Sequence, residues 1–414
     1  MQNAIASVFG AKKEPSFLPD AKEPALTQRV VSVDVYRGFV MLLMMAEILS
    51  FETVSKALPG SLFWQIVAFN QSHVPWNWLS LHDTIQPSFS FLVGVALPYS
   101  IASRKRKGAT FGALMRHTIV RSIILICLGI FLRSMHFRQT YFTFEDTLTQ
   151  IGLGYTFLVL LSFCSRRVQI TALVIILVGY WLAFVLYPLP GPGFNYALTG
   201  VPQDWPYNVR GFAAHWNKNI NLAWAFDRWF LNLFPRESPF VYHGGGYATL
   251  SFIPTLGTMM LGLLAGQMLR SGIAGKEKLK FFISTGLGLV VLGIVLQITG
   301  INPIVKRIWT PAWTIFSGGI SFLFLAFFYG TIDLTNRKKW SFLFMVIGMN
   351  SIVAYVLADG FSPFIVNSLF IHLGAHYDQL FGTAYATLVK GGIVLLIEWL
   401  ILYWMYRKKI FVKI

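Results

Sequence analysis

The sequence predicts an all-α protein that crosses a membrane about ten times, with both termini in the cytoplasm and one large loop on the other side. Composition is the first observation behind this fold class: 55% of the 414 residues are hydrophobic and 12% are charged. Globular chains average about 45–50% and about 25% respectively. Mean hydropathy is +0.59. These values exclude a disordered chain and disfavour both a soluble enzyme and a nucleic-acid-binding protein, despite a net charge of +17.

The second observation is a series of apolar stretches, each close to the ~20 helical residues that a bilayer requires. The stretches are 34–54, 84–103, 113–133, 147–165, 168–187, 249–269, 279–299, 312–333, 341–361 and 384–406. Most Lys and Arg residues fall on one alternating side of them, in clusters such as Arg104–Lys107 and Arg407–Lys409. Because positively charged loops stay in the cytoplasm, this asymmetry predicts cytoplasmic termini.

Two further segments complete the predicted organisation. Residues 1–29 are polar and hold no long apolar run, so we expect a cytoplasmic tail rather than a signal peptide. Residues 30–414 are expected to form a single transmembrane domain, whose long outer loop spans about 188–248. That loop is rich in Trp and Tyr, which suit either an interfacial belt or a platform for a sugar ring. Cys127 and Cys164 fall in apolar runs and indicate neither a disulfide nor a metal site.

The first predicted span opens with residues 32–38 (Ser-Val-Asp-Val-Tyr-Arg-Gly). Asp34 and Arg37 are three residues apart, so they share a helical face and can pair. Two interpretations stay open: the pair anchors the helix end, or Arg37 binds an anion that arrives from the cytoplasm. Further along, Glu47 is an acid well inside the span, and a carboxylate at such depth is by default a functional hypothesis.

The densest set of polar groups lies in residues 73–94, just outside the second predicted span. It contains His73, Asn77, His82 and Asp83. Histidine is the natural general base near neutral pH, and a carboxylate can orient the imidazole and stabilise its cation. The alternative is that these groups only cap helix ends. For the cluster as a whole we favour the functional interpretation.

These motifs resemble heparan-α-glucosaminide N-acetyltransferase and its bacterial relatives. The resemblance is carried by the Ser-Val-Asp-x-x-Arg-Gly opening, the stretch from His73 to Gly94, residues 254–266, Trp309-Thr310 and residues 348–351 (Gly-Met-Asn-Ser). The spacing His-x-x-Trp-Asn-x-Leu-x-x-x-Asp is the most specific of them. The resemblance implies a membrane acyltransferase that passes an acetyl group from cytoplasmic acetyl-CoA to an amino sugar or glycan hydroxyl outside.

In that family pattern His73 falls on the catalytic histidine and Asp83 on an acid that follows it. The residues that we expect to bind the acceptor are Glu47, Trp76, Asn77, Asp227, Arg228, His243, Trp309 and Asn350. Those expected to bind acetyl-CoA are Ser32, Asp34, Arg37, Arg104, Lys105 and Arg116. No metal is expected.

The chain departs from the family at two places. Residues 46–48 (Ala-Glu-Ile) lack the amide that the family carries there, and an acidic motif before the sixth span is replaced by residues 244–247 (Gly-Gly-Gly-Tyr). A transporter or flippase for a glycan or lipid precursor is the alternative function, because ten spans and a basic cytoplasmic face suit it as well. Expected partners are the acceptor, acyl-CoA and the bilayer, with a homodimer left open, and the expected location is a bacterial inner membrane.

Overall fold

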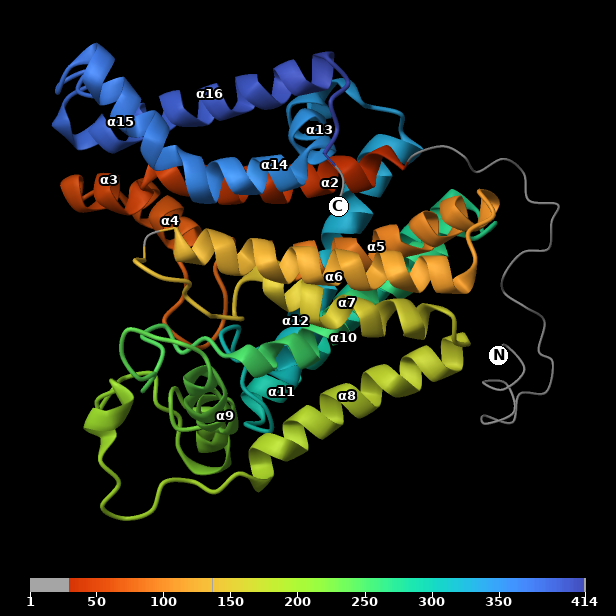
Figure 1. Cartoon of the computed structure of the whole chain (residues 1–414), viewed down its shortest axis with the longest axis vertical. Helices are drawn as coiled ribbons and strands as arrows, with labels where there is room; N and C mark the ends of the chain where they lie inside the picture. Colours follow the sequence, from red (N-terminus) through yellow and green to blue (C-terminus); the bar gives the residue numbers. More distant parts are fainter. Residues whose placement is uncertain (1–29, 136, 413–414) are drawn as a thin grey trace. The chain divides into compact units, whose positions relative to one another are not determined.

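The computed structural model describes residues 30–135 and 137–412, so the predicted tail, 1–29, lies outside the described residues. In the described part every named regular element is helical, which confirms the all-α class. The helices are α2 (Val31–Met45), α3 (Phe51–Ala57), α4 (Leu62–Gln71), α5 (Ile85–Arg106), α6 (Phe111–Ser134), α7 (Thr147–Ser162), α8 (Arg166–Leu186), α9 (Leu222–Phe230), α10 (Phe252–Arg270), α11 (Gly275–Ile298), α12 (Pro311–Phe328), α13 (Phe342–Met349), α14 (Ser351–Val356), α15 (Ser362–Leu373) and α16 (Ala386–Arg407). Most of the long helices run lengthwise beside one another, and α9 lies in the looped region at one end (Figure 1).

Eight helices of the described part are long and apolar enough to cross a membrane. A ninth results if the segments Val31–Leu49 and Phe51–Ala57, which are bent by 42° relative to each other, form one span. Ser50 makes the bend by adopting a φ of 48°, in the left-handed region. The predicted stretch 147–165 is a shorter apolar helix, Thr147–Ser162.

The predicted ninth span, 341–361, is placed wrongly. The chain breaks at Asn350, and the long helical segment runs from Ser351 to Leu373. At the break the Asn350 amide donates to the carbonyl of Ile410 at 2.9 Å and accepts from the N–H of Val412 at 3.0 Å. A side chain that binds backbone in this way competes with regular helical hydrogen bonds. Asn350 therefore fastens the segment after α16 and does not continue a helix.

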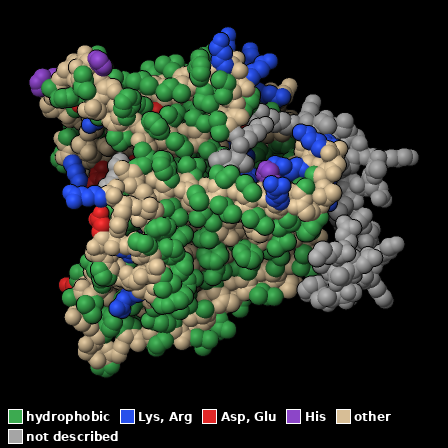
Figure 2. All heavy atoms as spheres, in the orientation of Figure 1, with side chains coloured by type: hydrophobic (Ala, Val, Ile, Leu, Met, Phe, Trp, Pro, Cys, Tyr) green, Lys and Arg blue, Asp and Glu red, His purple; other side chains and the backbone are tan. Residues whose placement is uncertain are grey.

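The outer faces of several long helices are apolar. Val174 and Ile175 in α8, and Leu287 and Val291 in α11, are each more than half exposed. Soluble proteins rarely display such surfaces, whereas lipid tails accept them. Figure 2 shows hydrophobic side chains spread across the middle of this face, with Lys and Arg gathered mainly toward its ends.

Glycines allow a very close contact between α5 and α10. A Cβ added to Gly94 of α5 would lie 1.9 Å from the carbonyl oxygen of Met259, and one added to Gly262 of α10 would lie 1.9 Å from that of Phe91. Small residues allow backbones to approach in a bilayer, where apolar surface alone gives helices no reason to associate. The contact holds α5 rigidly, and the polar segment 73–83 leads directly into α5.

We therefore expect Gly262→Ala to destabilise the protein, because its methyl group has to separate α5 from α10. Overpacking of this kind costs about 1–3 kcal/mol. The matched control is Gly288→Ala in α11, where nothing lies within 4 Å of the added Cβ. There alanine should be neutral or stabilising by up to about 1 kcal/mol, since it restricts the unfolded chain. Thermal unfolding of both variants in detergent, followed by tryptophan fluorescence, checks this, and equal melting temperatures contradict it.

Candidate active site

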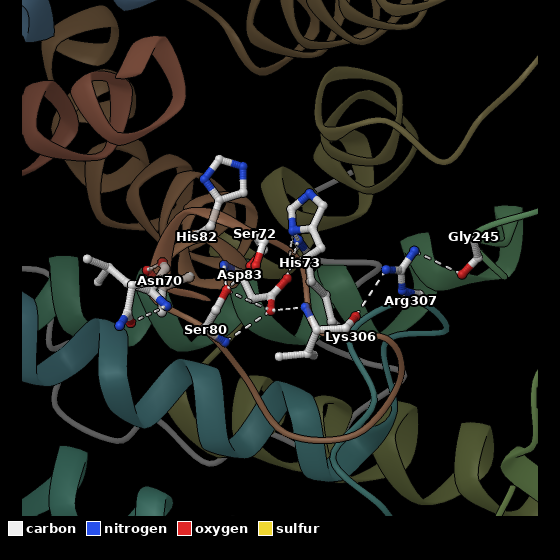
Figure 3. Close-up of polar contacts among 12 residues, drawn as sticks. Asn70, Ser72, His73, Ser80, His82, Asp83, Gly245, Lys306 and Arg307 are labelled. Atoms are coloured by element: carbon white, nitrogen blue, oxygen red, sulfur yellow. Dashed lines mark hydrogen bonds and ion pairs between the residues drawn. The ribbon is translucent and has the colours of Figure 1, made fainter. Parts of the chain in front are cut away.

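The predicted pair of His73 and Asp83 is brought together. His73 lies in the loop between α4 and the short helix η2 (His82–Thr84), and Asp83 lies within η2. The imidazole Nδ1 of His73 is 2.8 Å from Oδ1 of Asp83. The His73 side chain is 37% exposed, whereas that of Asp83 is 1% exposed. The arrangement gives an accessible imidazole backed by a buried carboxylate (Figure 3).

A third charged group, Lys306, completes the cluster. It comes from the loop between α11 and α12, and its Nζ lies 3.0 Å from Asp83 Oδ1 and 3.2 Å from His73 Nδ1. The Lys306 side chain is only 5% exposed. A buried carboxylate is stable only when it is paired and hydrogen-bonded, and Lys306 supplies the compensating charge.

Lys306 is absent from the site residues predicted from the sequence. It is separated from His73 by 233 positions, so no local spacing connects the two. Only its position in the sequence could have indicated Lys306 as a site residue. It lies three residues before the Trp309-Thr310 stretch, which carries part of the family resemblance.

The contacts of Asp83 decide which nitrogen of His73 carries the proton. An ionised carboxylate only accepts hydrogen bonds. A lone pair on Nδ1 facing Oδ1 at 2.8 Å would be repelled, so we assign the proton to Nδ1, which donates to Asp83. The Lys306 ammonium, 3.2 Å from Nδ1, then donates to Asp83 Oδ1 and not to the ring. The lone pair of the neutral ring is then on Nε2, as a general base requires.

Partial burial lowers the pKa of His73 below its usual 6.5. The hydrogen bond to Asp83 acts in the opposite direction, and the charge of Lys306 adds to the lowering. The imidazole is therefore neutral at pH 7.

The second oxygen of Asp83 is held by the backbone of the same loop. Oδ2 accepts from the N–H of Val74 at 3.2 Å and from the N–H of Ser80 at 3.1 Å. The carboxylate thus closes the 73–83 loop on itself while it orients His73. This local closure explains why the predicted pair meets even though ten residues separate its members.

The Lys306 loop is fixed against the His73 loop by backbone and side-chain contacts. Asn77 and Val305 form an isolated antiparallel bridge, and the N–H of Trp78 donates to the carbonyl of Ile304 at 3.1 Å. Arg307 then binds the carbonyl oxygens of Val74 and Gly245, each at 3.0 Å. The guanidinium joins three segments of the chain at the site (Figure 3).

Glu47 and His82 border the cluster on the side of the first span. Glu47 lies in η1 (Ala46–Leu49), the short helix that follows α2, and its Oε2 is 3.6 Å from Nε2 of His82. The His82 and His73 rings are 4.7 Å apart between centroids. The Glu47 side chain is 67% exposed, so its carboxylate is available beside the buried His82.

Two predicted acceptor contacts, Trp76 and Trp309, are core residues. Both are fully buried, and their indole N–H groups donate to the carbonyl of Trp216 and to the hydroxyl of Thr258. Neither ring offers a face to an acceptor. Asn77 differs from them, because its Oδ1 is buried and lacks a hydrogen-bond partner among the described residues.

The predicted residues of the large loop have separate positions. Asp227 is buried in α9 and accepts from the N–H of Thr249 at 3.0 Å, and burial raises its pKa to about 7. Arg228 is exposed and stacks over the ring of Trp224 at 4.9 Å. The ring of His243 accepts from the N–H of Gly245 at 2.9 Å, and burial lowers its pKa to about 4. His243 is therefore a neutral anchor of the glycine segment.

The same glycine segment lies close to the His73 segment. Gly246 has a φ of 78°, and an added Cβ would lie 2.6 Å from the ring of Trp76. A side chain at that position would be strained and crowded. The glycine lets the loop approach the His73 segment closely, as the Arg307 bond to Gly245 also requires.

The residues predicted to bind acetyl-CoA are spread over three helices. Arg37 and Asp34 form the expected pair at 3.3 Å in α2, and Ser32 donates to a carboxylate oxygen of Asp333. The other three predicted residues surround the turn between α5 and α6. Arg104 contacts Nε2 of His117 at 2.7 Å, Lys105 lies over the ring of Phe163 at 5.1 Å, and Arg116 is exposed in α6.

Metal ligands are not clustered in the part of the chain that the structure describes. In residues 30–135 and 137–412, no group of three or more His, Cys, Asp or Glu side chains could hold a metal ion.

Two known proteins are similar to the chain along nearly all of its length. Heparan-alpha-glucosaminide N-acetyltransferase from Homo sapiens is 25% identical over 434 aligned residues, covering 94% of this chain and 60% of the human protein. The protein of the same name from Mus musculus is 24% identical over 431 aligned residues, covering 93% and 60%. The chain therefore spans about 60% of the length of these relatives. No protein-family profile matches it. The resemblance predicted from the motifs is confirmed.

We expect Arg307→Gln to loosen the contact between the three joined segments, because glutamine cannot bind both carbonyl oxygens. Each hydrogen bond to a charged group contributes about 1.5–3 kcal/mol. Hydrogen exchange should therefore accelerate at least tenfold in residues 74–80 and 244–247, while the centres of α5 and α10 stay protected. Arg138→Gln, at an exposed position, is the control. Unchanged exchange in both segments of the Arg307 variant contradicts the assigned role.

Proposed function

We propose that the chain is a membrane-embedded acetyltransferase that moves an acetyl group from cytoplasmic acetyl-CoA across the bilayer to an amino sugar or glycan hydroxyl. The observation that carries the proposal is the cluster of His73, Asp83 and Lys306, with an accessible neutral imidazole. The two N-acetyltransferases to which the chain is similar support the choice of reaction. The apolar helices indicate an integral membrane protein, and we propose a bacterial inner membrane as its location.

The length of α5 supports transfer across the bilayer. The helix has 22 residues, and the cluster lies just before its first residue, whereas Arg104, Lys105 and Arg106 occupy its last turn. At 1.5 Å per residue the helix is roughly 33 Å long, close to the ~30 Å of a hydrocarbon core. The cluster and the basic residues therefore suit opposite faces of a membrane.

In the proposed reaction His73 is a general base. Its Nε2 takes a proton from the acceptor amine or hydroxyl while that nitrogen or oxygen bonds to the thioester carbonyl carbon. The carbon–sulfur bond then breaks, and the CoA thiolate takes the proton from the imidazolium. The products are the acetylated acceptor and CoA with a free thiol, so no oxidant or further reactant is required. Asp83 holds the ring by its Nδ1–H and stabilises the transient cation.

The acceptor is proposed to bind where polar groups border the imidazole. Glu47 offers an exposed carboxylate beside His82, and Asn77 has a carbonyl oxygen without a partner among the described residues. An acceptor sugar has hydroxyl and amine donors that suit both groups. Arg228 and His243 belong to the outer loop and are proposed to bind the remainder of a larger acceptor.

On the cytoplasmic side, acetyl-CoA is proposed to bind the basic residues at the ends of α2, α5 and α6. Arg37, Arg104, Lys105 and Arg116 supply cations that suit a cluster of phosphates. Arg37 is held by Asp34 at 3.3 Å, so a phosphate would share the guanidinium with that carboxylate. Ser32 lies five residues before Arg37 on the same helix.

Replacement of His73 tests the chemistry. We expect His73→Ala to lower acetyl transfer by about 10²–10⁴-fold, the usual contribution of a general base, and to leave acetyl-CoA binding nearly unchanged. In the unmodified protein the rate should be constant at neutral pH and fall as the solution is acidified. Because the pKa of His73 is lowered, the midpoint of that fall should lie below pH 6.5. Near-normal turnover of the alanine variant would refute the role of His73.

Donor binding separates the proposal from a transporter or flippase. Acetyl-CoA should raise the melting temperature of the detergent-purified protein in a saturable manner, because a ligand of the folded state stabilises it by mass action. Dephospho-CoA should act more weakly, and Arg37→Gln should shift the titration to higher concentrations. If millimolar acetyl-CoA does not change the melting temperature, the result favours a transporter or flippase and contradicts the role of His73 in acetyl transfer.

A further inference from the structure

We propose that Lys306 is a positioning residue of the reaction. Its ammonium group shares the Asp83 carboxylate with His73 and thereby keeps the resting imidazole neutral under conditions in which an Asp–His pair alone would hold a proton. The inference rests on the proposed function in one respect, namely that a neutral His73 is the active form.

The geometry that carries this inference is a closed triangle of polar atoms. Lys306 Nζ, Asp83 Oδ1 and His73 Nδ1 are separated by 3.0 Å, 2.8 Å and 3.2 Å along the three sides. Two donors thus converge on one carboxylate oxygen, and both Asp83 and Lys306 are nearly inaccessible to solvent. An exposed ion pair is weakly coupled, whereas this pair is shielded from water and directly adjacent to the ring.

The triangle makes the two cations competitors for one negative charge. A carboxylate at hydrogen-bond distance favours the imidazolium, and a nearby cation disfavours it. With Lys306 present, the Asp83 charge is already compensated when the ring is neutral. Without Lys306, the ring is the group in direct contact that can replace the missing positive charge, so a proton on Nε2 becomes favourable.

The other charged and titratable groups around His73 are placed differently. From η2, His82 faces the ring at 4.7 Å between centroids. From η1, Glu47 is mostly exposed and contacts His82 at 3.6 Å. From the α11–α12 loop, Arg307 binds the carbonyl of Val74 and points its other nitrogen to Gly245. Among the described residues named here, Lys306 is the cation in contact with both Asp83 and His73.

The inference assigns Lys306 two opposite effects on the reaction. It keeps the base available in mildly acidic solution, which favours turnover there. It also reduces the stabilisation that Asp83 gives to the imidazolium formed during transfer. Removing its charge should therefore depress the rate at low pH far more than at high pH, a pattern that simple loss of folded protein does not produce.

The test follows the protonation of His73 directly, without requiring a known acceptor. Diethyl pyrocarbonate modifies neutral imidazole, and His73 is accessible enough to react. The full chain in lipid nanodiscs is modified between pH 5 and 9, and the modification rate at His73 is read by fragment-ion mass spectrometry. In Lys306→Met the midpoint of this rate should rise by about one pH unit or more. In Lys306→Arg, which keeps the charge, it should stay near that of the unmodified protein.

A second variant secures the test if Lys306→Met fails to fold. Lys306→Gln also removes the charge but keeps a hydrogen-bond donor for Asp83, so its His73 midpoint should rise in the same direction. A midpoint that is unchanged in either folded variant without the Lys306 charge overturns the role of Lys306. The acetyl-transfer assay is independent of this measurement. If the His73 midpoints shift as expected but no acetyl transfer is detected, the proposed function is contradicted, whereas the role of Lys306 beside His73 and Asp83 is supported.

Discussion

The buried carboxylate of Asp83 is the constraint on which the site depends. An ionised group that is 1% exposed cannot remain unpaired, so the fold must bring a cation and several donors to it. Lys306 provides the cation, His73 donates from its ring, and the backbone of Val74 and Ser80 supplies two further hydrogen bonds. Satisfying one charge therefore fixes the 73–83 loop, the orientation of the imidazole and the position of the α11–α12 loop.

These loops stay in register because the helices that carry them are closely packed. The glycine contacts between α5 and α10 allow backbone atoms to touch, and Gly38 and Gly348 do the same for α2 and α13. Because the loops of the His73 cluster are attached to the ends of these helices, the close helix packing also restricts the movement of the loops. The polar cluster is then held in place at one end of α5 while the outer surface of the bundle stays apolar for lipid.

Two neighbouring segments shape the surroundings of His73. Glu47 faces His82 at 3.6 Å and leaves its carboxylate exposed. The glycines at 244–246 allow Arg307 and Trp76 to contact their loop. These two segments are also where the sequence departs from the pattern that the family resemblance leads us to expect.

The sequence by itself determined the helical membrane fold, most of the long apolar helices and the pairing of His73 with Asp83. Hydrophobic length is a local property, and ten residues of loop can close on one carboxylate. Only the tertiary structure decided the rest. Lys306 reaches Asp83 from 223 positions away, and the amide of Asn350 breaks a helix because it binds a segment 60 positions further on. Trp76 and Trp309 are aromatic residues of the kind that can form a sugar-binding surface. In the fold they are buried, because other segments of the chain pack over them. Contacts between distant segments depend on the packing of the whole chain, and no local pattern encodes them.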